Sequence, residues 1–247
     1  TLFRSGKTTC TYLLERLFAQ AGHKLGVMGT VSYRWPGHNE AAPLTTPDVL
    51  SVHAMLAAMR GAGTDTAIME VSSHALALGR VAGVEYDTAV FTNLTQDHLD
   101  FHKTFENYLA AKCKLFEQVS RPNQHKAGKG AVINIDDAYG HRVVEKNSAP
   151  LITYGTKGQG TLEAENLTIT SKTSAYDIRY HGEVYPIHMR ITGLFNVYNT
   201  LAAIEKKYGS DIAAKITNNF YRDDDLLSPY LNRADFRWQP SQIGNIH

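Results

Sequence analysis

Two blocks rich in acids and histidines each follow a short apolar run of this chain. Residues 70–74 read Glu-Val-Ser-Ser-His and follow the run 66–69, while residues 92–102, which include Asp97 and His98, follow the run 88–91. Such short apolar runs indicate buried strands. Because ligands gather beyond the carboxyl ends of parallel strands, both blocks are expected to line one crevice. A carboxylate and imidazoles that converge there predict a metal-binding or proton-transfer site.

A third segment predicts that this crevice handles phosphate. Gly6, Lys7, Thr8 and Thr9 stand at the start of an amphipathic segment. In Gly-Lys-Thr loops the backbone N–H groups cradle phosphates, the lysine reaches the outer phosphates and the hydroxyl binds Mg²⁺. The first glycine of the usual loop would fall on Thr1, so the signal is incomplete. The α/β pattern of the chain strengthens it.

Apolar strands alternate with amphipathic helices over the first 155 residues, which predicts a parallel sheet covered on both faces. We therefore expect an α/β fold, a P-loop three-layer sandwich with a mostly parallel central sheet. Residues 161–192 alternate in the strand period and predict a small antiparallel sheet added to the main one. Residues 30–46 are expected to form a loop, and Thr46 to cap the helix that follows.

The bulk composition is that of a soluble globular protein. The 247 residues are 43% hydrophobic and 20% charged, with a formal net charge of +1. This balance gives no argument for nucleic-acid binding, and the lack of a long apolar run argues against membrane insertion. The two cysteines lack metal-binding spacing, which fits reduced thiols and a cytoplasmic location.

Taken together, these segments resemble the central ATP-binding domain of the Mur ligases over residues 6 to about 204. Within that family the likeness is to the ligases that add the third amino acid to UDP-MurNAc-L-Ala-D-Glu during peptidoglycan synthesis. Several long motifs occur in the family's order, which is more specific than any one of them. They cover residues 70–74, 79–81, 91–102, 110–112, 134–137 and 193–199.

The resemblance implies a reaction and its catalytic residues. ATP phosphorylates the substrate carboxylate, the amine of the incoming amino acid attacks the acyl phosphate, and an amide forms. Cations must offset the charge of the transferring group, so Lys7 and Mg²⁺ are implied. Thr8, Glu70 and His98 are implied as Mg²⁺ ligands. Lys112 is implied to be carbamylated and to bind a second Mg²⁺, which requires a neutral amine and therefore a lowered pKa.

The resemblance also implies binding residues. Asn196, Asn199 and Asp137 would contact the adenine or ribose of ATP. Four further residues, Thr45, Thr46, Ser72 and Arg80, would contact UDP-MurNAc-L-Ala-D-Glu, and an arginine offers a bidentate fork for a phosphate or carboxylate. The second substrate would be a diamino acid, with diaminopimelate and lysine left open. The family implies a monomer.

Both ends of the chain depart from the family pattern. Residues 1–5 are expected to be a non-native leader, since Phe3 replaces a glycine that lets backbone approach phosphate. Residues 6–205 form the expected domain, and residues 206–247 an atypical tail. Alone, this polypeptide is expected to lack ligase activity. The alternatives are a folylpolyglutamate or cyanophycin synthetase, another Mur-type ligase, or a non-catalytic nucleotide-binding module.

Overall fold

The computed structural model describes residues 6–94, 99–122 and 129–203, so the predictions for residues 1–5 and 206–247 lie outside it. The helices are α1 Lys7–Gln20, α2 Val49–Gly61, α3 Ser73–Ala77, α4 Leu99–His102, α5 Phe105–Ser120, α6 Gly140–Val144 and α7 Leu194–Ala203. The strands are β1 Leu25–Met28, β2 Ser32–Trp35, β3 His38–Ala41, β4 Thr66–Met69, β5 Thr88–Phe91, β6 Gly130–Asn134, β7 Leu151–Gly155, β8 Leu162–Ile169, β9 Ser174–Tyr180 and β10 Glu183–Met189.

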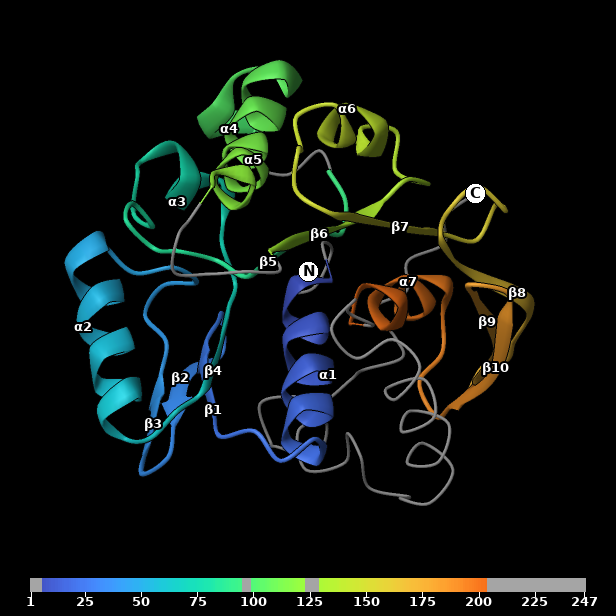
Figure 1. The fold of residues 1–247 in the computed structure, drawn as a ribbon, viewed down its shortest axis with the longest axis horizontal. Helices are drawn as coiled ribbons and strands as arrows, with labels where there is room; N and C mark the ends of the chain where they lie inside the picture. The colour runs from blue at the N-terminus through green and yellow to red at the C-terminus, as the bar shows by residue number, and fades with distance from the viewer. Residues whose placement is uncertain (1–5, 95–98, 123–128, 204–247) are drawn as a thin grey trace.

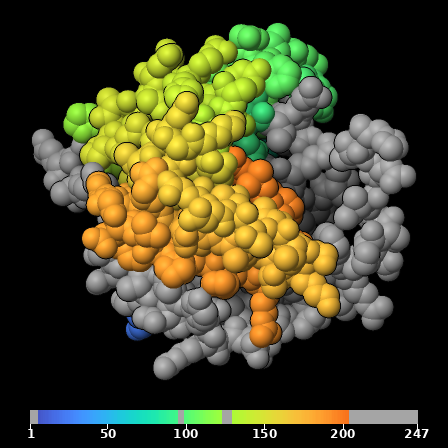
Figure 2. All heavy atoms as spheres, turned by 90° about the vertical axis from the view of Figure 1, so that its right-hand side faces the viewer, coloured from blue at the N-terminus to red at the C-terminus, as the bar shows by residue number. Residues whose placement is uncertain are grey.

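The larger sheet has six strands in the order β10-β9-β8-β7-β6-β5. Strands β5 to β8 run parallel, while β8, β9 and β10 form an antiparallel meander. The antiparallel strands are thus added to the main sheet, as expected, and continue it from β7. The junction is short, because β7 and β8 pair at only Tyr154–Leu162 and Gly155–Glu163. Figure 2 shows the face that the yellow and orange segments of this meander cover.

Helices cover both faces of this sheet, as a three-layer sandwich requires (Figure 1). Side chains of β6 alternate between the two faces: Val132 packs with α1 and α7, whereas Ala131 and Ile133 pack with α5 and α6. This is the two-residue period of a strand that is buried on both sides. Leu13 of α1 and Leu201 of α7 lie in the same buried cluster as Val132. The predicted fold class is confirmed.

The smaller sheet has four strands in the order β3-β2-β1-β4, with β1 and β4 parallel. Its hairpin β2–β3 corrects the prediction of a loop over residues 30–46. Trp35 pairs with His38 across a Pro36-Gly37 turn, in which Gly37 has φ +81°. Proline followed by glycine is the preferred pair for a turn that needs a positive φ at its third position. That signal was present in the sequence, flanked by the alternating Tyr33 and Trp35.

The start of α2 corrects a second prediction. Asp48, not Thr46, is the N-cap: its carboxylate accepts hydrogen bonds from the N–H groups of Leu50 and Ser51. Thr46 is buried and only 1% exposed. At other helix ends, Thr104 caps α5 and Gly22 follows α1 at φ +90°. Among the described residues, no helix is both long and apolar enough to span a bilayer.

Candidate nucleotide and metal site

Glu70 lies buried at the carboxyl end of β4, with an exposed fraction of 3%. Its carboxylate accepts a hydrogen bond from the hydroxyl of Thr8 at 2.9 Å. Thr30 donates both its backbone N–H, at 3.0 Å, and its hydroxyl, at 2.9 Å. A buried carboxylate surrounded by hydroxyls is an oxygen-rich group of the kind that Mg²⁺ prefers. The structure therefore brings together the predicted pair of Thr8 and Glu70, and adds Thr30, which the sequence analysis missed.

At the N-terminus of α1, the backbone of Gly6 lies close to the side chain of Asn199. Gly6 has φ +70°, and a Cβ at this position would lie 2.1 Å from Oδ1 of Asn199. Only glycine fits such a position without strain. Asn199 is buried in α7, and its amide lies 3.4 Å from Oδ1 of Asn196. Of the residues predicted on the adenine side, Asn199 thus lies against Gly6, and Asn196 lies beside Asn199.

Lys112 of α5 lies between groups of opposite charge. Burial and the positive charge of Lys7 lower the pKa of Lys112 to about 7, while Asp137 opposes the shift. Its Nζ donates to the carbonyl of Asn93 at 2.9 Å and lies over the rings of Phe91 and Tyr108. The lowered pKa makes a neutral amine accessible near pH 7, unlike in an ordinary exposed lysine. This is the protonation state that carbamylation requires.

Asp137 and its neighbour Asp136 tie the ends of several elements together. Asp137 accepts hydrogen bonds from the N–H groups of Leu94 and Tyr139. Asp136 accepts from the N–H and the hydroxyl of Thr156, after β7, and from the hydroxyl of Tyr198 at 2.7 Å. The contact between Asp136 and Tyr198 fixes α7 against the end of β6. The sequence gives no local signal for these contacts, because the partners of Asp136 lie 20 and 62 residues away.

The residues predicted to contact the sugar nucleotide lie close to Glu70. The hydroxyl of Thr46 donates to the carbonyl of Glu70 and accepts from the N–H of Ser72. A guanidinium nitrogen of Arg80 donates to the carbonyl of Thr46 at 3.1 Å. Thr45 contacts the hydroxyl of Thr30 at 3.1 Å. These residues thus form one connected group beside the Thr8–Glu70 pair.

His98 lies outside the described residues, so its position relative to Glu70 remains a prediction. Within the described ranges, no group of three or more His, Cys, Asp or Glu side chains could hold a metal ion. The donor set that the structure does show for a cation consists of one buried carboxylate and the hydroxyls of Thr8 and Thr30.

The amino-acid sequence of this chain is similar to those of known ligases. Two curated relatives are named UDP-N-acetylmuramoyl-L-alanyl-D-glutamate–2,6-diaminopimelate ligase. The one from Lactiplantibacillus plantarum is 43% identical over 211 residues, which cover 84% of this chain and 42% of the relative. The one from Geobacter sulfurreducens is 39% identical over 212 residues, which cover 86% of this chain and 42% of the relative. The chain thus spans less than half the length of either relative.

A solved structure of a protein with the same printed name superposes with a TM-score of 0.76 at 29% identity. The superposition covers 87% of this chain and 44% of that one. The model of the Mur ligase middle domain matches residues 5–205, which is most of the chain. This chain therefore belongs to the Mur ligase family, through that family's middle domain.

Proposed function

We propose that this chain is the ATP-binding domain of a ligase that adds the third amino acid to UDP-MurNAc-L-Ala-D-Glu in peptidoglycan synthesis. The observation that carries the proposal is the assembly of Lys7, Thr8, Glu70 and Lys112 around the start of α1. The relatives named above support the same assignment. Their printed names favour 2,6-diaminopimelate over lysine as the added amino acid.

The residues present fit a bound nucleotide with Mg²⁺. Gly6 stands at the N-terminus of a 14-residue helix, where N–H groups and the helix dipole favour an anion. Thr8 and Glu70 offer oxygen ligands to the cation. When bound, ATP would supply the phosphoryl group that activates the substrate carboxylate, and Mg²⁺ would offset its charge. Lys7 would bind the outer phosphates, and Asn196 and Asn199 would orient the adenosine end.

Lys112 is proposed to be carbamylated. Its neutral amine attacks CO₂, a C–N bond forms, and a proton leaves, so that an ammonium of lowered pKa is replaced by an anionic carbamate. The carbonyl of Asn93 already accepts from Nζ and holds the side chain in place. A second Mg²⁺ would then find a carboxylate-like ligand at this position, with His98 proposed as a ligand of the first.

The sugar nucleotide is proposed to bind beside Glu70, at Thr45, Thr46, Ser72 and Arg80. Thr46 and Ser72 have their polar groups engaged within the protein, so their contribution would include shaping the backbone here. The guanidinium of Arg80 uses one nitrogen toward Thr46 and would bind an anionic group of the substrate with the others. We propose a cytoplasmic monomer, in keeping with the family resemblance.

The function is tested with the full-length protein that contains this chain. Purified enzyme is supplied with UDP-MurNAc-L-Ala-D-Glu, ATP, Mg²⁺ and either meso-2,6-diaminopimelate or L-lysine, and tripeptide product and phosphate are quantified. We expect product with diaminopimelate, loss of at least about a hundredfold in kcat for Lys7→Met, and little change for the exposed Lys24→Met. Absence of amide formation with both amino acids, in a protein that binds nucleotide, would favour the non-catalytic alternative.

Carbamylation is tested separately by ¹³C NMR in ¹³C-bicarbonate at pH 8. We expect a carbamate resonance in the wild type that is lost in Lys112→Arg and kept in Lys114→Arg, since Lys114 is exposed on the same helix. The same carbamate signal in both variants would place the modification elsewhere.

A further inference from the structure

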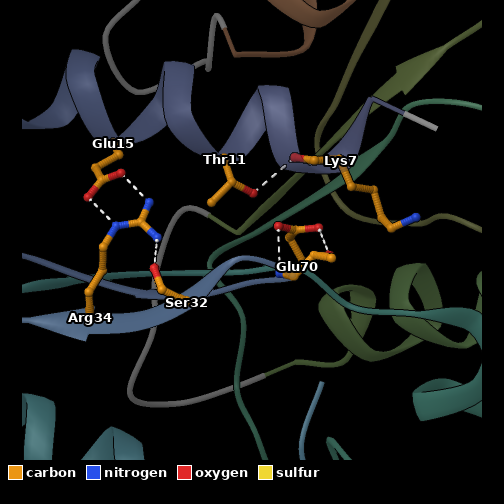
Figure 3. A network of polar contacts seen from close by, with 7 residues as sticks. Lys7, Thr11, Glu15, Ser32, Arg34 and Glu70 are labelled. Atoms are coloured by element: carbon orange, nitrogen blue, oxygen red, sulfur yellow. Dashed lines mark hydrogen bonds and ion pairs between the residues drawn. The ribbon is translucent and has the colours of Figure 1, made fainter. Parts of the chain in front are cut away.

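A bidentate ion pair joins the phosphate-loop helix to the small sheet. Arg34 of β2 donates from Nε to Oε1 of Glu15 at 2.8 Å and from Nη2 to the second carboxylate oxygen. Its third nitrogen donates to the hydroxyl of Ser32 at 2.9 Å, and its guanidinium lies 4.7 Å from the ring centre of Tyr12. Figure 3 shows Glu15 descending from α1 onto Arg34, with Ser32 on the far side of the guanidinium.

This ion pair is largely withdrawn from solvent. The side chains of Arg34 and Glu15 are 15% and 17% exposed. A comparable pair, Arg179 with Glu165 between β9 and β8, has side chains that are 39% and 41% exposed. A partly buried bidentate pair resists sliding and rotation of one element against the other, since both N–H···O bonds must be kept. The planar guanidinium on the Tyr12 ring adds a second constraint.

The same two segments of chain also hold Glu70. Thr8 reaches it from α1, and Thr30, four residues before Arg34, reaches it from the turn between β1 and β2. Thr8 and Glu15 are seven residues apart and share one face of the helix, about 10 Å along its axis. The helix and the β1–β2 segment are therefore joined at two points, at Glu70 and at Arg34.

The two junctions share α1 and the β1–β2 segment, so a movement of the helix would affect both. A rotation or shift of α1 would separate the hydroxyl of Thr8 from the carboxylate that Thr30 holds, unless a second contact fixes the helix against β2. The opposite side of α1 packs against α7 through apolar side chains, which Leu13 and Leu17 contribute. Apolar packing is less directional than a two-point hydrogen-bonded fork. The ion pair is thus the directional contact that fixes the register of α1 against β2.

We propose that Arg34 and Glu15 are positioning residues that keep Thr8 and Glu70 together for the Mg²⁺ of a bound nucleotide. This rests on the proposed function, because it assigns Glu70 and Thr8 to that cation. Neither Arg34 nor Glu15 is among the residues that we propose to contact the substrates or the cation. Residues that orient a metal ligand from behind change metal affinity or activity by about 10- to 100-fold when they are altered.

The test uses the full-length ligase with Arg34→Lys, Glu15→Gln and the control Arg179→Lys. Lysine keeps the charge but cannot form the fork, so Arg34→Lys separates position from charge. We expect the apparent KM for Mg-ATP to rise about tenfold in Arg34→Lys and Glu15→Gln. The KM values for the sugar nucleotide and the amino acid should stay within about twofold, and Arg179→Lys should behave as the wild type.

A second readout needs neither metal nor turnover. Hydrogen–deuterium exchange of the metal-free protein reports on the peptide that contains the Thr30 N–H, which donates to Glu70. We expect faster exchange there in Arg34→Lys and unchanged exchange in Arg179→Lys. Melting temperatures identify any variant that has lost its fold. If Arg34→Lys or Glu15→Gln does not fold, Glu15→Asp replaces it, because aspartate keeps the carboxylate on a shorter side chain.

The outcomes separate the two proposals. If the wild type neither binds Mg-ATP nor forms product, the proposed function fails. If the wild type is active but Arg34→Lys leaves both the KM for Mg-ATP and the exchange at Thr30 unchanged, the positioning role is wrong. If Arg34→Lys lowers the melting temperature but leaves the KM for Mg-ATP unchanged, the ion pair only stabilises the fold and the positioning role is wrong.

Discussion

The hydroxyl of Thr8 lies 2.9 Å from a carboxylate oxygen of Glu70, across 62 residues of sequence. One residue comes from the first turn of α1 and the other directly follows β4. Because Thr30 adds two further hydrogen bonds, the carboxylate is fixed from two sides before any cation binds. Such preorganisation reduces the cost of ordering a metal ligand.

Replacing Glu70 by Gln should weaken Mg-nucleotide binding by about 10- to 100-fold, since the charge is lost while the side-chain shape is kept. Isothermal titration of the full-length protein with Mg-ADP measures this. Glu145→Gln, at an exposed position after α6, is the control and should bind as the wild type. If Glu70→Gln binds Mg-ADP as tightly as Glu145→Gln does, Glu70 is not a ligand of the cation.

Replacing Gly6 by Ala should destabilise the fold by about 2 kcal/mol or more. The positive φ costs about 1 kcal/mol for a residue with Cβ, and the clash with Asn199 adds about 1–3 kcal/mol of overpacking. Gly22→Ala is a matched control: its φ is +90°, but nothing lies within 4 Å of its added Cβ. Urea denaturation should give the larger loss for Gly6→Ala. Equal losses of unfolding free energy in the two variants would show that the side chain of Asn199 moves aside without an energetic cost.

Replacing Lys112 by Met should stabilise the fold in acid more than in alkali. Its pKa falls from 10.5 in the unfolded chain to about 7 in the folded one. Below pH 7 both states are protonated and the folded state bears the full cost of a desolvated ammonium. That cost declines as the pH rises from 7 to 10.5.

The measurement is the free energy of unfolding of Lys112→Met and of the exposed control Lys114→Met, from pH 6 to pH 10, in CO₂-depleted buffer. The difference between Lys112→Met and wild type should shrink with rising pH, while that for Lys114→Met should stay flat. A pH-independent difference at Lys112 would contradict the lowered pKa.

Replacing Tyr198 by Phe should destabilise the fold by about 1–2 kcal/mol, because its hydroxyl donates to the carboxylate of Asp136. It should also weaken nucleotide binding, since Tyr198 holds the helix that carries Asn199. A double-mutant cycle with Asp136→Asn should show coupling of about 1 kcal/mol, with Tyr185→Phe on β10 as the control. If the effects of Tyr198→Phe and Asp136→Asn on the free energy of unfolding are additive, the hydrogen bond between the two side chains does not stabilise the fold.

Local patterns predicted most of the elements correctly. The apolar run before Glu70 forms β4 as expected, so that the acid follows the strand end. The hairpin over residues 32–41 was missed because β3, which reads His-Asn-Glu-Ala, is polar, whereas the equally short β1, β4 and β5 are apolar runs. Thr46 was misassigned as a cap, since a threonine before proline has the same local pattern whether its hydroxyl serves a helix or, as here, a distant strand end.

The sequence by itself determined most of the strands and helices, though not the β2–β3 hairpin. It also determined the glycine and lysine that open α1 and the acid at the end of β4, because these depend on short-range periodicity and residue type. The tertiary structure alone decided which groups meet: Thr30 with Glu70, Asp136 with Tyr198, and Glu15 with Arg34. It also decided the lowered pKa of Lys112, which follows from burial beside Lys7. Hydrogen bonds and desolvation act through space over a few ångströms, and the partners here are 19 to 105 residues apart along the chain.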